Sequence, residues 1–168
     1  MLRLFGISLF FCCSFACAKA ADFTQISRDT ILPTVFRIGE YEAVYDELLI
    51  EYETLLLSAC DHSMTDAFNK WKSMLLDMEK YSEDVGYDLK GTKLWVNVFW
   101  NADGTIRHFA YYLKPVSRNL DLQELNAFLE SFVRYYRFPL EHHTQYSHYG
   151  TAMFPLLPNK HLKKRYKK

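Results

Sequence analysis

The chain has 168 residues, with 20 Lys and Arg against 20 Asp and Glu, and 49% of its residues are hydrophobic. This length suits one domain, alone or with an appendage, and the apolar content excludes a disordered chain. The zero net charge argues against a dedicated nucleic-acid binder, which usually carries net positive charge.

Residues 1–20 have the pattern of a secretory signal peptide. Arg3 provides the positive start, residues 4–18 are uncharged and mostly apolar, and Ala18-Lys19-Ala20 fits a cleavage site. The mature chain would then begin at Ala21. The apolar run is shorter than the ~20 residues that span a membrane, which favours cleavage. An uncleaved anchor is the alternative.

Cys17 offers a second processing route, because Ser14-Phe15-Ala16-Cys17 resembles a bacterial lipobox, although the family favours a Leu-like residue where Ser14 stands. We therefore expect an exported protein, periplasmic or secreted, with an outer-membrane lipoprotein as the alternative. Cleavage after residue 20 leaves Cys60 as the remaining cysteine. This excludes an intramolecular disulfide in the mature chain and predicts a buried free thiol.

Two helices are predicted between residues 40 and 88, after an extended leader from Ala21 to Gly39. From Glu40 onward, apolar residues recur every three or four positions, which is the period of a helix that packs on one face. Ser63 stands where an N-cap of the second helix is expected. The short polar break between the helices predicts an antiparallel helical hairpin, so that residues 21–88 form a leader and an acidic helical hairpin.

A strand hairpin follows, because residues 94–100 alternate between two faces and residues 105–113 form the return strand. Between them, Asp103-Gly104 supplies the positive φ that a tight turn requires. A third helix is capped by Asn119 or Asp121 and ends at Phe138-Pro139.

Residues 141–148 are then expected to form a polar loop, and Tyr149 to Leu157 a last strand whose far end Pro155 confines to a sheet edge. The predicted fold class is α+β: a helical hairpin followed by a small antiparallel sheet that carries one helix. The second region, residues 89–158, has the order β-β-α-β and is followed by a tail, residues 159–168.

The order of elements from Lys90 to Pro158 resembles the C-terminal domain of TonB-type energy transducers. The matching residues are Gly91, Leu94 to Trp100, Asp103-Gly104, Leu120-Asp121, Tyr136-Arg137-Phe138-Pro139 and Gly150 to Leu157. The family's inner-membrane helix and Pro-rich spacer have no counterpart here, and Arg118-Asn119 stands where the family often has Gly. The resemblance therefore implies a fold and a mode of partner binding, without energy transduction.

By this resemblance, the last strand would recruit an extended peptide from a protein partner in the envelope as an added strand. The residues implied are Tyr149, Gly150, Thr151, Ala152, Met153 and Phe154. The alternative is that another part of the chain, such as the leader at residues 21–39, already covers this edge.

The tail is the clearest charged feature of the sequence. Its cationic residues are Lys160, Lys163, Lys164, Arg165, Lys167 and Lys168. Such a tail could contact anionic lipid headgroups or an acidic protein surface, including the acidic helices of this chain, or serve solubility alone. Nucleic acid is not an expected partner of an exported protein.

No catalytic signature is present: the sequence lacks a nucleophile elbow, a phosphate-binding loop, a dinucleotide fingerprint and a zinc-protease motif, and no cofactor is predicted. Weak metal-ligand candidates are His142, His143 and His148, near Glu141, although their spacing matches no familiar site. A non-enzymatic binding or assembly protein of the bacterial cell envelope is the leading hypothesis. The alternative is an exported hydrolase or metal-dependent enzyme that uses the His-rich loop.

Overall fold

A computed structural model describes residues 32–156. Within this range the chain forms four helices and four strands, so the α+β class predicted from the sequence is confirmed. The elements in chain order are β1 (Val35–Arg37), α1 (Glu42–Glu51), α2 (Leu56–Ala59), α3 (Met64–Asp84), β2 (Lys93–Trp100), β3 (Ile106–Leu113), α4 (Leu122–Tyr135) and β4 (Tyr146–Met153).

The strands form one sheet in the order β1-β3-β2-β4. The β2–β3 and β2–β4 pairs are antiparallel, as the predicted hairpin requires, whereas β1 pairs with β3 in parallel. The sheet is therefore mixed, and β1 and β4 are its two edges. β1, which belongs to the described part of the leader, pairs with β3, so β4 is the opposite edge of the sheet.

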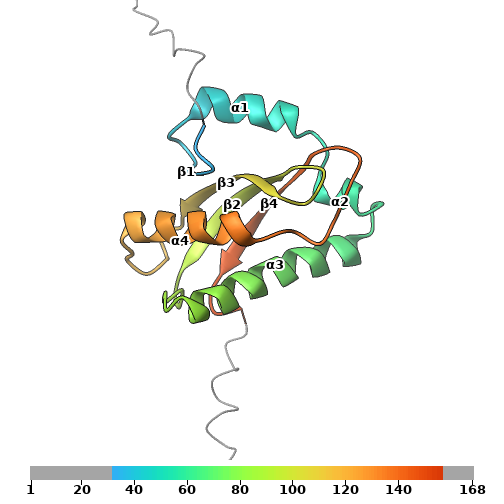
Figure 1. Cartoon of the computed structure of the whole chain (residues 1–168). Helices are drawn as coiled ribbons and strands as arrows, with labels where there is room; N and C mark the ends of the chain where they lie inside the picture. The colour runs from blue at the N-terminus through green and yellow to red at the C-terminus, as the bar shows by residue number, and fades with distance from the viewer. Residues whose placement is uncertain (1–31, 157–168) are drawn as a thin grey trace, which may run out of the picture. The chain divides into compact units, whose positions relative to one another are not determined.

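Helices lie on both faces of this sheet (Figure 1). The main core joins α3 and α4 to one face, where buried residues such as Met74, Leu129 and Val96 pack together. A smaller core on the other face joins Leu48 of α1 to Phe99 of β2. Both cores bury apolar side chains that would otherwise be exposed to water, which is the main stabilising contribution to such a fold.

The predicted helical hairpin does not form, because α1 and α3 pack against opposite faces of the sheet (Figure 1). The first helical pattern is also interrupted: α1 ends at Glu51, and Leu55 forms a bridge with Ser147 before the short helix α2 begins. One side of α1 thus faces the sheet, where Leu48 is buried with Phe36 and Phe99.

The helices α3 and α4 begin where the sequence indicates. The Ser63 hydroxyl accepts a hydrogen bond from the Asp66 N–H at the start of α3. The Asp121 carboxylate accepts hydrogen bonds from the Gln123 N–H, at 2.7 Å, and the Glu124 N–H at the start of α4. These contacts satisfy N–H groups that have no partner within the helix.

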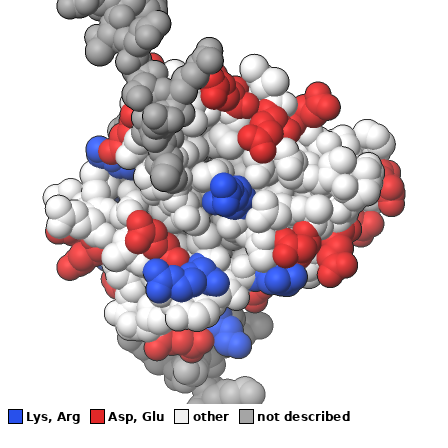
Figure 2. All heavy atoms as spheres, turned by 45° about the horizontal axis from the view of Figure 1, so that its top comes forward, with Lys and Arg blue, Asp and Glu red and all other residues white. Residues whose placement is uncertain are grey.

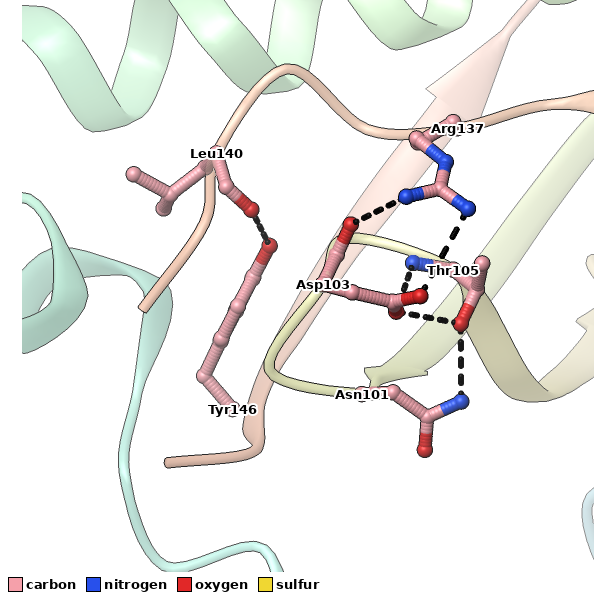
Figure 3. Close-up of polar contacts among 6 residues, drawn as sticks. All are labelled: Asn101, Asp103, Thr105, Arg137, Leu140 and Tyr146. Carbon is pink, nitrogen blue, oxygen red and sulfur yellow. Dashed lines mark hydrogen bonds and ion pairs between the residues drawn. The ribbon is translucent and has the colours of Figure 1, made fainter. Parts of the chain in front are cut away.

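A cluster of polar contacts fastens the β2–β3 turn to the segment that leads into β4 (Figure 3). The Asp103 carboxylate accepts hydrogen bonds from the Thr105 N–H and hydroxyl, at 3.0 and 2.6 Å. Arg137 donates to the Asp103 main-chain oxygen, and the Tyr146 hydroxyl donates to the Leu140 oxygen at 2.7 Å. These contacts fix the start of β4 against the hairpin.

The last strand begins three residues earlier than predicted, at Tyr146. Tyr146 and Ser147 are buried, so the end of the predicted polar loop, including His148, belongs to the sheet. The predicted signal peptide with Cys17, residues 21–31 of the leader and the basic tail lie outside the described residues. In the range that is described, no helix is long and apolar enough to cross a membrane.

Candidate binding edge of the sheet

The direction of the main-chain groups in β4 follows from two hydrogen bonds at its ends. The Ser147 N–H points away from β2, because it donates to the Thr54 oxygen at 2.9 Å. The Phe154 N–H points toward β2 and donates to the Thr92 oxygen, also at 2.9 Å. Since main-chain groups alternate in an antiparallel pair, the N–H and C=O groups of Tyr149, Thr151 and Met153 point outward.

These outward groups form an open stretch of edge. Among residues 32–156, no hydrogen-bond partner lies opposite the outward main-chain groups of Tyr149, Thr151 and Met153. The stretch is bounded on one side by the Ser147 contact and on the other by Phe154, which turns back to β2. Three successive outward-pointing residues, each two positions apart, present a template for another strand.

β4 also lacks the features that usually protect an exposed edge. Natural sheets discourage edge pairing with charged side chains, proline or bulges. The strand from Tyr146 to Met153 contains no Lys, Arg, Asp, Glu or Pro, and its pairing with β2 runs without a register shift. Its one titratable imidazole, His148, is packed against the Trp71 ring at 4.6 Å between ring centroids. Burial lowers the pKa of His148, which favours its neutral form.

The opposite edge, β1, is closed by its own chain. The Arg37 N–H donates to the Glu40 carboxylate at 3.1 Å, and the Glu40 N–H donates to the Arg37 oxygen at 3.2 Å. The two side chains also form an ion pair. Because the Glu40 turn occupies the outward main-chain groups of Arg37, an added strand could not pair with the full length of β1.

The face of the sheet beside α1 carries exposed aromatic side chains next to the β4 edge. Trp95 of β2 lies between Thr151 of β4 and Tyr112 of β3 in the strand register. The Trp95 and Tyr112 rings stack at 5.6 Å, and the Lys114 Nζ lies 5.1 Å from the centre of the Trp95 ring. Trp95 remains 40% exposed. The alternation of residues 94–100 puts Trp95 on the face opposite Leu94 and Val96, but it does not show that α1 covers just part of that face.

The other face beneath β4 is closely packed against α3. A Cβ atom at Gly150 would lie 2.9 Å from the Trp71 indole, so glycine permits this approach. Ala152 and Phe154 are buried on the same face. Of the six residues predicted for partner binding, Tyr149, Thr151 and Met153 are exposed and available to a partner, whereas Ala152 and Phe154 hold the strand against the core.

The histidine candidates are not brought together as a metal site. The His142 and His143 rings lie 3.9 Å apart in the loop before β4, while His148 packs against α3. Among the residues that the structure covers, no group of three or more His, Cys, Asp or Glu side chains could hold a metal ion. Cys60 is a buried free thiol, as predicted, and burial raises its pKa.

A cavity of about 580 Å³ lies between β1 and α4. Its two carboxylates already have partners: Glu40 pairs with Arg37, and Glu130 accepts a hydrogen bond from Asn126 at 2.9 Å. The residues that line it include no Ser, Cys or His. The lining therefore lacks the Ser–His and Cys–His pairs that activate a hydroxyl or thiol nucleophile.

Comparisons of the chain with protein-family models, with curated proteins and with solved structures found no match. The interpretation of the β4 edge therefore depends on its geometry and chemistry.

Proposed function

We propose that this protein is a non-enzymatic, exported binding or assembly factor of the bacterial cell envelope that captures an extended segment of a protein partner. The observation that carries the proposal is the open β4 edge, where the outward groups of Tyr149, Thr151 and Met153 have no partner among the described residues. A segment that adds here gains main-chain hydrogen bonds, and its alternate side chains provide specificity.

The contrast between the two edges supports this proposal. β1 is closed by the Glu40 turn, whereas β4 is long, uncharged and regular. An exposed edge of this kind promotes aggregation, and natural proteins usually protect it. The lack of protection at β4 therefore favours a role for this edge in binding a partner. Export rests on the pattern of residues 1–20, and the basic tail at residues 159–168 remains a proposed contact for an anionic membrane surface.

Substitution at Thr151 tests strand addition. Thr151→Pro removes an outward N–H group, and proline is tolerated at such a position because no bond to β2 is lost. The control Thr151→Val keeps the N–H group and the shape of the side chain. Envelope extract is passed over the immobilised wild type and both variants, and bound proteins are compared by quantitative mass spectrometry.

A partner retained by the wild type and by Thr151→Val, and lost with Thr151→Pro, is the expected result. Equal recovery of the partner by all three proteins would contradict the strand-addition proposal. Bound metal in the purified protein would favour the metal-dependent enzyme instead. The intact mass of the purified protein tests export separately, because a start at Ala21 or a lipid adduct at Cys17 gives a distinct mass.

A further inference from the structure

The side chains around Thr151 shape the surface that an added strand would meet on the open face of the sheet. Thr151 is small, and the larger Tyr149 and Met153 stand two residues to either side, about 7 Å away along the strand. These two side chains are 57% and 52% exposed. Behind Thr151, on β2, stands the Trp95 indole. We call this arrangement of Thr151, Tyr149, Met153 and Trp95 the Thr151 notch.

The Trp95 indole is held from its far side. Tyr112 stacks on it, and Lys114 lies over its ring. Tyr112 lies on β3 and Lys114 directly follows that strand, so both contacts reach Trp95 from the side of β2 opposite β4. Because adjacent strands are about 4.8 Å apart, the backbone of an added strand would lie about 10 Å from β2. A large side chain of the added strand, lying over Thr151, could reach the Trp95 indole on β2, whereas a small side chain could not.

Two lysines lie in the strand register beside the Met153 end of the notch. The row that contains Met153 continues to Lys93 on β2 and then to Lys114, whose N–H donates to the Lys93 oxygen at 2.9 Å. This row holds two cations and no carboxylate. Figure 2, which brings the α1 side forward, shows acidic groups near the top and further acidic groups in the lower half among the Lys and Arg groups. A carboxylate on the partner complements the lysine row.

We propose that the segment captured at β4 carries an aromatic side chain opposite Thr151 and a carboxylate two residues away, opposite Met153. This inference rests on the proposed function, because it requires strand addition at β4. Residues directly opposite in paired strands share one face of the sheet, so both side chains would lie on the Trp95 face. The aromatic ring fills the Thr151 notch, and the carboxylate lies beside Lys93.

A library of random ten-residue peptides displayed on phage tests this pattern without knowledge of the natural partner. Peptides are selected on the purified full-length protein and then measured against four variants. Thr151→Trp fills the notch and keeps the outward N–H group, Thr151→Val is its control, and Thr151→Pro removes that group. The double substitution of Lys93 and Lys114 by Glu reverses the charge of the row.

Trp95 fluorescence reports binding at the notch, because the other two tryptophans, Trp71 and Trp100, are buried. The expected peptides carry an aromatic and an acidic residue two positions apart and change the Trp95 emission. These peptides should bind Thr151→Val as tightly as the wild type and bind Thr151→Trp and Thr151→Pro at least tenfold more weakly. Selection on the charge-reversed protein should yield peptides with a basic residue in place of the acidic one.

Other outcomes separate the two proposals. Peptides that lose affinity for Thr151→Pro but bind Thr151→Trp unchanged, or that lack the pattern, would overturn the notch and leave strand addition intact. If selection yields no peptide that Thr151→Pro weakens, both proposals fail. A dimer that Thr151→Pro dissociates would assign the edge to a second copy, and peptide binding that requires removal of residues 157–168 would assign it to the chain's own tail. Either result overturns the inference.

Discussion

Proline at neighbouring positions of β4 should have opposite consequences for stability, because the N–H groups alternate in direction. Ala152 is fully buried and its N–H points toward Leu94 on β2. Ala152→Pro removes that hydrogen bond and leaves the Leu94 carbonyl without a partner, at a cost of about 1–3 kcal/mol. Forcing the ring into a packed site adds about 1–3 kcal/mol, so we expect a total of about 3 kcal/mol or more.

Thr151→Pro loses no bond to β2, so its expected cost is under about 1 kcal/mol, partly offset by the lower entropy of the unfolded chain. Urea unfolding followed by circular dichroism measures both values. With a slope of about 2 kcal/mol per molar urea, Ala152→Pro should lower the midpoint by about 1.5 M and Thr151→Pro by less than about 0.5 M. Equal shifts, or a larger shift for Thr151→Pro, would refute the assignment of outward groups at β4.

Three further outcomes are expected elsewhere in the molecule. In urea unfolding, Gly104→Ala should lower the stability of the protein by about 3 kcal/mol or more, because φ is +81° and the new Cβ would lie 2.4 Å from the Phe138 oxygen. Gly86→Ala should cost about 1 kcal/mol, because φ is also positive there but the space around it is open. Burial lowers the pKa of His148 from its ordinary value of 6.5, so its contribution to stability is present above that pH and is lost as the pH falls further. Unfolding between pH 7.5 and 5 should therefore depend less steeply on pH in His148→Gln. Cys60 should react slowly with a thiol reagent in the native protein and rapidly in urea, because the thiol is buried and its pKa is raised.

Each of these expectations has a clear contrary result. Similar losses for the two glycine variants would mean that the close approach at Gly104 does not matter. An unchanged pH slope in the His148 variant would place the pH dependence on other groups. Rapid modification of Cys60 without denaturant would show that its surroundings open readily.

Local signals predicted the local elements well. The apolar period and the caps at Ser63 and Asp121 correspond to the starts of α3 and α4, and Asp103-Gly104 forms the predicted turn. These features depend on residues within a few positions of one another, so sequence carries them directly.

The arrangement of the elements depended on contacts between distant residues. The period of α1 indicates an apolar face but not which surface that face covers, and the sheet rather than α3 receives it. The leader contributes β1, whose pairing with β3 decides which edge of the sheet stays open. The predicted site residues included the open stretch of β4. Strand register brings Trp95 into the notch and Lys93 beside Met153, and no local pattern reports that register.

Amide hydrogen exchange along β4, measured residue by residue by NMR in the free protein, tests the central claim most directly. The account predicts an alternating pattern: fast exchange at Tyr149, Thr151 and Met153, whose N–H groups point outward, and slow exchange at Gly150 and Ala152, whose N–H groups bond to β2. Uniformly slow exchange through Thr151 and Met153 would contradict it, because the edge would then already be covered.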